Sequence, residues 1–270
     1  MYADGMKIVC LKGGLGNQMF EYCRFRDLME SGNDKVYLFY DRRRLKQHNG
    51  LRLSDCFELE LPSCSWGIKL VVWGLKICRA VGVLKRLYDD EKPEAVLIDD
   101  YSQHRRFIPN ARRYFFFRQF LAELQSGFVQ MIRAVDYPVS VHVRRGDYLH
   151  PSNSIFGLCG VDYFQQAIAY VRKKRPDARF FFFSDDMEWV RENLWMEDAV
   201  YVEHTELMPD YVDLYLMTLC RGHIISNSTF SFWGAYLAVD GNGMKIYPRR
   251  WFRDPTWTSP PIFSEEWVGL

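Results

Sequence analysis

A regular alternation of short apolar segments and amphipathic segments fills the second half of the sequence, and few folds accommodate such a pattern. Segments of strand length alternate with segments of helix length, which predicts βαβ units and a parallel sheet. The run 180–183 consists entirely of phenylalanine, as expected for a strand that is covered on both faces. We expect strands at 139–143, 179–183, 199–202, 223–226 and 244–247, and helices at 162–174, 186–194, 208–220 and 229–238.

The first half of the sequence starts with a similar unit. A strand at 6–12 leads through the glycine-rich turn 13–18 into a helix. Further strands are expected at 36–40 and 95–98 and a helix at 119–135, after which Pro138 acts as a helix breaker. We therefore predict an α/β chain of two Rossmann-like domains, residues 1–136 and 137–270. The proline-rich tail from Tyr247 onward is expected to have no regular structure.

The turn after the first strand matches a dinucleotide-binding fingerprint only in part. Gly14 and Gly16 fit the first two glycine positions, but Met19 occupies the third, where close helix packing needs glycine or alanine. The sequence also has no phosphate-binding P-loop motif. An NAD-dependent oxidoreductase, for which Asp41 would be a suitable acidic residue, is therefore a weak alternative.

Composition narrows the choice of partners and compartments. A formal net charge of +1 and a pI of about 7.6 give no reason to expect nucleic acid. The seven cysteines form no C-x-x-C pair, which favours a reduced intracellular protein. No signal peptide is visible, and charged residues interrupt the apolar stretch 66–87, so we expect no transmembrane segment. That stretch is either a helix that covers the first domain, which we favour, or a basic amphipathic helix on a membrane surface.

Polar residues follow three of the expected strands in the second half. The motifs are Arg144-Arg-Gly-Asp147, Ser184-Asp-Asp186 and Ser226-Asn-Ser-Thr-Phe230. Because the carboxyl ends of parallel strands meet at the same edge of a sheet, we expect the three motifs to converge. A guanidinium stays charged at any working pH and matches the geometry of a phosphate or carboxylate. The sequence therefore predicts an anion-binding site at this edge.

Each motif also has a structural interpretation. Asp147 either holds an arginine by an ion pair or faces the substrate as a base, and one arginine of the pair is expected to meet a carboxylate. Segment 184–186 either binds a base or ribose or caps the next helix, and the cap is slightly favoured. Residues 226–229 either bind phosphate at a helix N-terminus or form an ordinary cap. His142 lies inside its strand, so we expect a buried, hydrogen-bonded side chain rather than a proton shuttle.

Four motifs together resemble those of the bacterial α-1,2-fucosyltransferases of glycosyltransferase family 11. They are Gly13-Gly-Leu-Gly-Asn-Gln-Met-Phe20, His142-Val-Arg-Arg-Gly-Asp-Tyr148, Phe183-Ser-Asp-Asp186 and Ser226-Asn-Ser-Thr-Phe-Ser-Phe-Trp-Gly-Ala235. The motifs occur in the family's order and cover the chain almost from end to end. Two departures are small: Glu21 stands where many relatives have Gln, and Phe232 where many have Trp.

The resemblance implies an α/β fold of GT-B type, in which two Rossmann-like domains face each other across a cleft. The second domain would bind GDP-β-L-fucose, and the first would be the acceptor side. The resemblance also implies inversion at the anomeric carbon and no metal or other cofactor, and the lack of a D-x-D motif agrees with independence from metal. The donor-binding residues expected on this basis are Gly14, Asn17, His142, Arg144, Arg145, Asp185, Asn227, Ser228, Thr229 and Phe230.

The expected chemistry is a single displacement in which Arg144 neutralises charge on the leaving diphosphate. Asp147 is the candidate base, and Glu21 is a weaker rival. The family implies a terminal β-galactoside of a glycan or surface polysaccharide as acceptor, and we expect residues 42–87 to select it. We expect a cytoplasmic protein, with or without peripheral membrane contact. The alternative from another class is a non-catalytic protein that binds a nucleotide sugar or a glycan.

Overall fold

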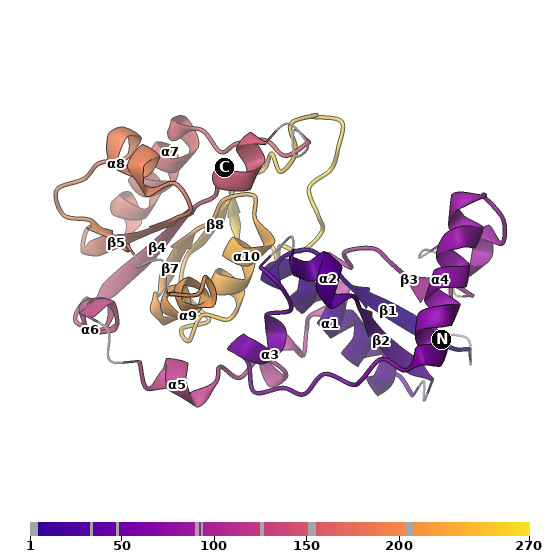
Figure 1. Cartoon of the computed structure of the whole chain (residues 1–270). Coiled ribbons are helices and arrows are strands. Elements are labelled where there is room, and N and C mark those ends of the chain that lie inside the picture. Colours follow the sequence, from indigo (N-terminus) through magenta and orange to yellow (C-terminus); the bar gives the residue numbers. More distant parts are fainter. Residues whose placement is uncertain are drawn as a thin grey trace. The chain divides into compact units, whose positions relative to one another are not determined.

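The computed structural model describes residues 5–32, 35–46, 49–89, 92, 94–124, 127–150, 155–203 and 208–270. The chain divides into two compact units, Met1–Arg118 and Gln119–Leu270 (Figure 1). Each unit contains a parallel sheet with helices, so the predicted α/β class is confirmed. The two units are called unit 1 and unit 2 below.

Unit 1 is built on a three-stranded parallel sheet in the order β2-β1-β3. Its strands are β1 (Lys7–Leu11), β2 (Val36–Tyr40) and β3 (Leu97–Ile98). Strand β1 is central and fully buried, as its apolar sequence predicts. The glycine turn then leads into α1 (Leu15–Glu30). The first strand-turn-helix unit therefore forms where the sequence predicts it.

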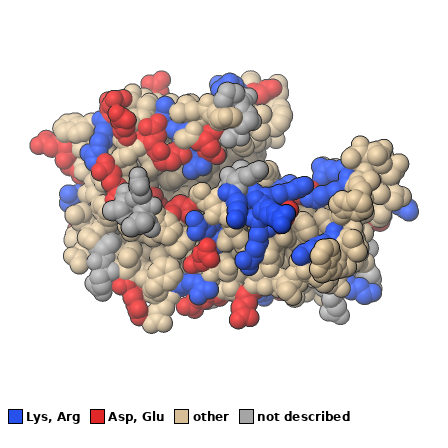
Figure 2. Space-filling view, viewed as in Figure 1, with Lys and Arg blue, Asp and Glu red and all other residues tan. Residues whose placement is uncertain are grey.

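The remaining helices of unit 1 are short, except for one. They are α2 (Arg42–Leu45), α3 (Leu53–Cys56) and α4 (Trp66–Ala80), with single 3₁₀ turns η2 (Lys85–Leu87), η3 (Arg105–Phe107) and η4 (Ala111–Arg113). Ser65 precedes α4 and caps it, because its side chain accepts a hydrogen bond from the N–H of Ile68. Figure 2 shows basic side chains gathered over α2, which consists largely of arginine.

Unit 2 contains a six-stranded parallel sheet in the order β6-β5-β4-β7-β8-β9. The strands are β4 (Tyr137–Val143), β5 (Ala178–Ser184), β6 (Val200–Tyr201), β7 (Gly222–Ile224), β8 (Lys245–Tyr247) and β9 (Val268–Gly269). The helices are α5 (Gln119–Ala122), α6 (Gly127–Arg133), η5 (Gly146–Leu149), α7 (Val161–Lys174), α8 (Met187–Asn193), α9 (Tyr211–Leu219) and α10 (Thr229–Tyr236). The alternation predicted from the sequence is therefore present throughout this unit.

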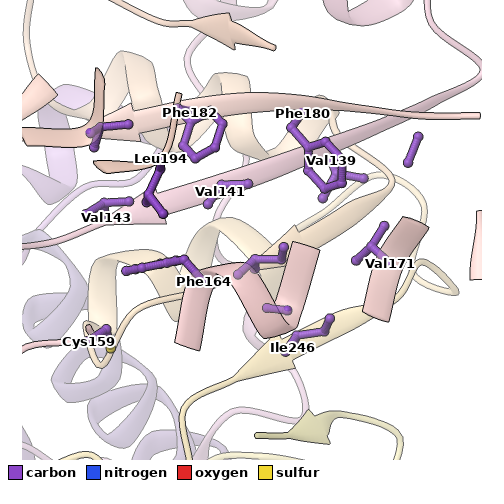
Figure 3. Packing of buried hydrophobic residues seen from close by; sticks show 14 of the residues in the cluster. Val139, Val141, Val143, Cys159, Phe164, Val171, Phe180, Phe182, Leu194 and Ile246 are labelled. Carbon is purple, nitrogen blue, oxygen red and sulfur yellow. The ribbon is translucent and has the colours of Figure 1, made fainter. Parts of the chain in front are cut away.

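One hydrophobic cluster of unit 2 lies between the sheet and the helices α7 and α8, while α9 and α10 lie on the other side of the sheet (Figure 1). Phe180 and Phe182 of β5 point toward Val139 and Val141 of β4 (Figure 3). Phe164 of α7 completes this apolar layer without any exposed surface. Because both faces of β4 and β5 are covered, the two strands need apolar residues at nearly every position.

Three features of the fold differ from the sequence predictions. The observed division at Arg118 lies earlier than the expected boundary after residue 136, because α6 packs on α9 of unit 2. The expected helix 119–135 is divided into α5 and α6, and residues 125 and 126 between them lie outside the described part of the chain. The tail does form a strand: β9 pairs with β8 through Ile246 and Val268, beyond the last proline, Pro261.

Candidate functional site

The three polar motifs of unit 2 meet at the carboxyl edge of the sheet, as predicted. Strand β4 pairs in parallel with β5 and with β7, and Val143 at the end of β4 lies opposite Ser184 at the end of β5. This register brings the residues that follow Val143 next to those that follow Ser184. The convergence is therefore a direct consequence of parallel pairing between three strands.

Arg144 is held between two carboxylates. Its Nε lies 2.9 Å and its Nη2 2.8 Å from Oδ1 of Asp147, and its Nη1 lies 3.1 Å from Oδ2 of Asp185. Burial opposes the charge of Arg144, but the carboxylates of Asp185 and Asp147 outweigh this effect and raise the pKa of the guanidinium. A guanidinium has five N–H donors, and these contacts engage three of its nitrogens once each. One N–H on each terminal nitrogen can still bind an anion, and the side chain is 34% exposed.

Arg145 has a different environment and is held in place by its own contacts. Its Nε donates to Oδ2 of Asp186 at 2.9 Å, and its guanidinium lies over the ring of Trp189 at 4.0 Å from the centroid. Its backbone N–H donates to Oδ1 of Asp185 at 2.9 Å. The prediction that one arginine of the pair meets a carboxylate is confirmed for Arg145, and Arg144 meets carboxylates as well.

Gly146 is the residue that allows Asp185 to approach this loop. A Cβ atom at position 146 would lie 2.7 Å from Oδ2 of Asp185, much closer than side-chain atoms normally approach. Asp186, rather than Asp185, caps α8 by accepting a hydrogen bond from the N–H of Trp189. The favoured reading of this motif as a helix cap therefore holds for Asp186, while Asp185 contacts both arginines.

His142 is buried in β4 beside this loop, as expected from its place in the strand. Its Nδ1 lies 3.3 Å from Oγ of Ser226, and its ring lies 5.5 Å from that of Phe230. Burial lowers the pKa of His142 to about 4, while the charges of Asp185 and Arg144 act in opposite directions. The imidazole is therefore neutral near pH 7, which fits a positioning role better than proton transfer.

The third motif begins α10, a helix of eight residues. Ser228 precedes the helix in an extended conformation, and its side chain caps no backbone N–H. Thr229 and Phe230 are the first helical residues and are partly exposed. The hydroxyls of Ser228 and Thr229 thus lie at the positive end of α10, where an anion is favoured.

Asn227 lies in the third motif, but its side chain is engaged by other residues of unit 2. Its side-chain nitrogen donates to the carbonyl oxygens of Gly157 and Trp251, each at 2.7 Å, and its Oδ1 accepts from the thiol of Cys159 at 3.5 Å. The residue is 1% exposed. The amide therefore ties three segments of unit 2 together, and the prediction that it binds the donor is not supported by this geometry.

Tyr148 directly follows Asp147, and the sequence predictions did not name it as a site residue. Its hydroxyl donates to the backbone oxygen of Asn227 at 3.0 Å, and its ring stacks on Phe156 with centroids 4.8 Å apart. Burial raises the pKa of this phenol above the usual range. Its position directly after Asp147 was the available signal, because the residues of one turn usually share a site.

Gly14 and Asn17 lie in unit 1, at the start of α1. Gly14 has an ordinary extended conformation and open space around its Cα, whereas Gly13 has φ +67° and lies close to the side chain of Asn17. Gly13 is therefore the position that requires glycine. Oδ1 of Asn17 accepts a hydrogen bond from Gln103 at 3.0 Å, and the residue remains partly exposed.

Glu21, the weaker candidate for the base, has no exposed surface. Its Oε2 accepts the backbone N–H of Lys12 at 2.8 Å, and within the described part of the chain its Oε1 has no hydrogen-bond partner. Burial raises the pKa of Glu21 well above its ordinary value. Because a fully buried carboxyl cannot contact an acceptor hydroxyl, this candidate is not supported.

Two cavities of similar volume have no candidate residue of unit 2 in their lining. One, of about 420 Å³, is lined by Gly157, Leu158, Cys159, Gly160, Tyr163, Gln166, Pro248, Arg250, Arg253 and Leu270. The other, of about 440 Å³, lies in unit 1 at the ends of β1 and β2 and includes Lys12, Asp99 and Tyr101.

The described residues contain no group of three or more His, Cys, Asp or Glu side chains placed to hold a metal ion. None of the described helices is both long and apolar enough to cross a membrane.

Sequence comparison relates this chain to known transferases. Residues 110–270 match the family described as glycosyl transferase family 11. The chain is 30% identical to an alpha-1,2-colitosyltransferase of Escherichia coli, over 96% of this chain and 97% of that protein. It is 25% identical to the O-antigen biosynthesis glycosyltransferase WbnK of Escherichia coli, over 97% and 99% of the two chains. The galactoside 2-alpha-L-fucosyltransferase SEC1 of Bos taurus is 33% identical over 49% of this chain and 38% of that protein.

Solved structures show the same fold. The fucosyltransferase NodZ from Bradyrhizobium matches with a TM-score of 0.52 and 16% identity, over 86% of this chain and 92% of that one. NodZ alpha-1,6-fucosyltransferase co-crystallised with GDP matches equally well, also with a TM-score of 0.52. The likeness supports the expected GT-B type of α/β fold. The family match covers more than half of the chain and contains three of the four motifs, so the chain belongs to glycosyltransferase family 11.

Proposed function

We propose that this glycosyltransferase is an inverting α-1,2-fucosyltransferase that moves L-fucose from GDP-β-L-fucose to the 2-hydroxyl of a terminal β-galactoside. Its relatives include an enzyme named for α-1,2 transfer of colitose and several named for α-1,2 transfer of fucose to galactosides. The name of one relative, which concerns O-antigen biosynthesis, favours a surface polysaccharide or a related glycan as acceptor. No metal takes part in the proposed reaction.

The observation that carries the proposal is the position of Arg144. Its guanidinium is fixed by Asp147 and Asp185 at the carboxyl edge of the sheet, and one N–H on each terminal nitrogen remains for an anion. During transfer, the acceptor oxygen bonds to the anomeric carbon while the bond from that carbon to the β-phosphate oxygen of GDP breaks. Negative charge develops on the diphosphate, and a preorganised cation stabilises it. Arg144 takes this role in the proposed reaction, and the hydroxyls of Ser228 and Thr229 at the start of α10 assist it.

Asp147 remains our candidate for the base that accepts the proton of the acceptor hydroxyl. Both contacts with Arg144 use its Oδ1, and the side chain is 43% exposed. Such an exposed carboxylate can reach an incoming hydroxyl, whereas Glu21 cannot. The same ion pair also supports a purely structural role, so Asp147→Asn separates the two: loss of transfer with intact GDP binding supports the base, and retained transfer contradicts it.

The first experiment measures GDP release from GDP-β-L-fucose by the purified chain in excess EDTA, with and without lactose. GDP release that requires lactose and is unaffected by EDTA supports a metal-independent transferase. NMR of the product tests the α-1,2 linkage. A parallel reaction with the colitosyl donor tests whether the site prefers the sugar named for the Escherichia coli relative. Donor binding without transfer to any β-galactoside would favour the alternative, a non-catalytic nucleotide-sugar-binding protein.

We also propose that the protein works in the cytoplasm. All seven cysteines are free, and five of them are buried, as suits a reducing compartment. Cell fractionation tests this location, and recovery of the protein from an extracytoplasmic fraction would contradict it.

A further inference from the structure

Helix α4 has two apolar faces, and only one of them is used by the fold. Ile68, Val72 and Leu75 are buried and pack with β1 and β3 in the core of unit 1. The second face is formed by Trp66, Leu70, Trp73 and Ile77, which recur at helical spacing and are 77%, 61%, 67% and 43% exposed. The sequence prediction that this helix covers the first domain is therefore correct but incomplete.

The exposed apolar surface continues beyond the end of α4. Val81, Val83 and Leu84 form the turn that follows the helix, and about half or more of each residue is exposed. Exposed tryptophan and aliphatic side chains in one continuous stretch exceed the scattered single residues of an ordinary protein surface. We call the second face of α4 and this turn the α4 surface.

The charged residues of the sequence stretch that carries the α4 surface have one sign. Residues 61–88 contain no Asp or Glu, and their basic residues are Lys69, Lys76, Arg79, Lys85 and Arg86. The ammonium of Lys69 lies 5.5 Å from the centre of the Trp66 ring, so the apolar and basic side chains adjoin. Lys76 and Arg79 both contact Asp99 of unit 1, although the side chain of Arg79 is still 51% exposed. Lys69, Lys85 and Arg86 are exposed as well. Figure 2 shows blue side chains next to uncharged surface where Figure 1 places α4.

We propose that the α4 surface lies on an anionic phospholipid bilayer, with Trp66, Leu70 and Trp73 at the level of the head groups. Tryptophan prefers this level, and lysine and arginine can extend from it toward lipid phosphates. A second copy of the chain is a poorer partner, because a two-fold contact would press this basic surface against itself. The proposal goes beyond the proposed function and does not depend on the identity of the donor or acceptor.

The test is flotation of the purified full chain with vesicles of phosphatidylcholine and phosphatidylglycerol, compared with vesicles of phosphatidylcholine alone. We expect binding to the anionic vesicles that weakens as salt rises toward about 1 M, where charges are screened within about 3 Å. The double variant Trp66→Ser/Trp73→Ser should bind about tenfold more weakly or worse. Its matched control is Trp195→Ser/Trp257→Ser, which replaces two exposed tryptophans of unit 2 and should leave binding unchanged.

A second pair of variants tests the charges. Lys85→Gln/Arg86→Gln should lower the partition coefficient about fivefold for each charge removed. Lys173→Gln/Lys174→Gln, on exposed positions of α7, is the matched control and should have no effect. Equal binding to neutral and anionic vesicles, equal loss in variants and controls, or no vesicle binding would each overturn the proposal. A dimer that dissociates when Trp66 and Trp73 are replaced, without vesicle binding, would assign the surface to a second copy instead.

Discussion

Nη1 of Arg144 lies 3.1 Å from Oδ2 of Asp185, and this ion pair joins the loop after β4 to the loop after β5. Asp185 also accepts the backbone N–H of Arg145 through its other oxygen. The carboxylate therefore positions the guanidinium of Arg144. The orientation of Arg144, which we propose binds the diphosphate, therefore depends on Asp185.

Asp185→Asn is predicted to slow transfer about ten- to a hundredfold, because a misplacement of about 1 Å costs up to about a hundredfold. Asparagine keeps the volume and can still accept the N–H of Arg145, so the fold should survive. Steady-state kinetics should show a lower kcat with a smaller change in KM for the donor. Asp198→Asn, which removes the exposed ion pair with Arg172, is the control and should leave kcat unchanged.

The two adjacent arginines are predicted to differ in what their removal costs. Arg144→Ala should lower kcat about 10²- to 10³-fold, as expected when one preorganised donor to a developing charge is lost. Arg145→Ala should mainly lower the free energy of unfolding, by about 1–3 kcal/mol, because it loses Asp186 and the Trp189 ring. Parallel measurement of kcat and of Tm separates the two effects. Near-normal turnover in Arg144→Ala would contradict its role.

Gly146→Ala is predicted to impair activity through Asp185. The added Cβ would meet Oδ2 of Asp185 at 2.7 Å, so the carboxylate must move and release Arg144. We expect a loss of kcat similar to that of Asp185→Asn, and no further loss when both changes are combined. Gly74→Ala on α4, where a Cβ would meet nothing within 4 Å, is the control. Additive losses in the double variant would contradict the shared mechanism.

The parallel pairing of β4 with β5 and β7 also explains which features of the candidate site could be predicted from the sequence. The apolar patterns of β4, β5 and β7 indicate buried parallel strands, and parallel pairing by itself brings their carboxyl ends together. The sequence does not state the register, and it is the pairing of Val143 with Ser184 that sets Asp185 and Asp186 beside the two arginines. A prediction of convergence was therefore possible, whereas a prediction of which carboxylate meets which arginine was not.

Other differences have similar causes. Asn227 lies in a motif typical of phosphate binding, but its partners are carbonyl oxygens of Gly157 and Trp251, far apart in sequence and without any side-chain pattern. Strand β9 has only two residues, too few for a periodic signal, and β8 supplies the pairing that defines it. In both cases tertiary contacts decide what local sequence leaves open.

Asn227→Ala is predicted to destabilise unit 2 rather than to weaken donor binding. The change leaves the two buried carbonyl oxygens of Gly157 and Trp251 without this donor, at a cost of about 2–4 kcal/mol. Calorimetry should show a lower Tm, while the Kd for GDP at a temperature well below Tm stays close to that of the natural sequence. A normal Tm with weakened GDP binding would restore the role first expected for this amide.

The stability of the protein is predicted to fall as the pH drops below about 6.5, in part because of His223. This residue of β7 is fully buried, and its Nδ1 lies 2.8 Å from Oγ of Ser140. Burial, with a contribution from the charge of Lys245, lowers the pKa of His223 to about 3. Between the two pKa values the unfolded chain binds a proton that the folded chain does not, so stability is lost as the pH falls through this window. His142, with a pKa of about 4, acts in the same direction.

His223→Gln isolates this contribution. Each buried neutral histidine contributes a slope of about 1.4 kcal/mol per pH unit, so the variant's unfolding free energy should depend less steeply on pH by that amount. Urea unfolding at a series of pH values between 7 and 4 measures the slope, which is informative even if the variant is less stable at every pH. If the slopes with and without His223 coincide, the buried imidazole is not the group that makes the fold sensitive to acid.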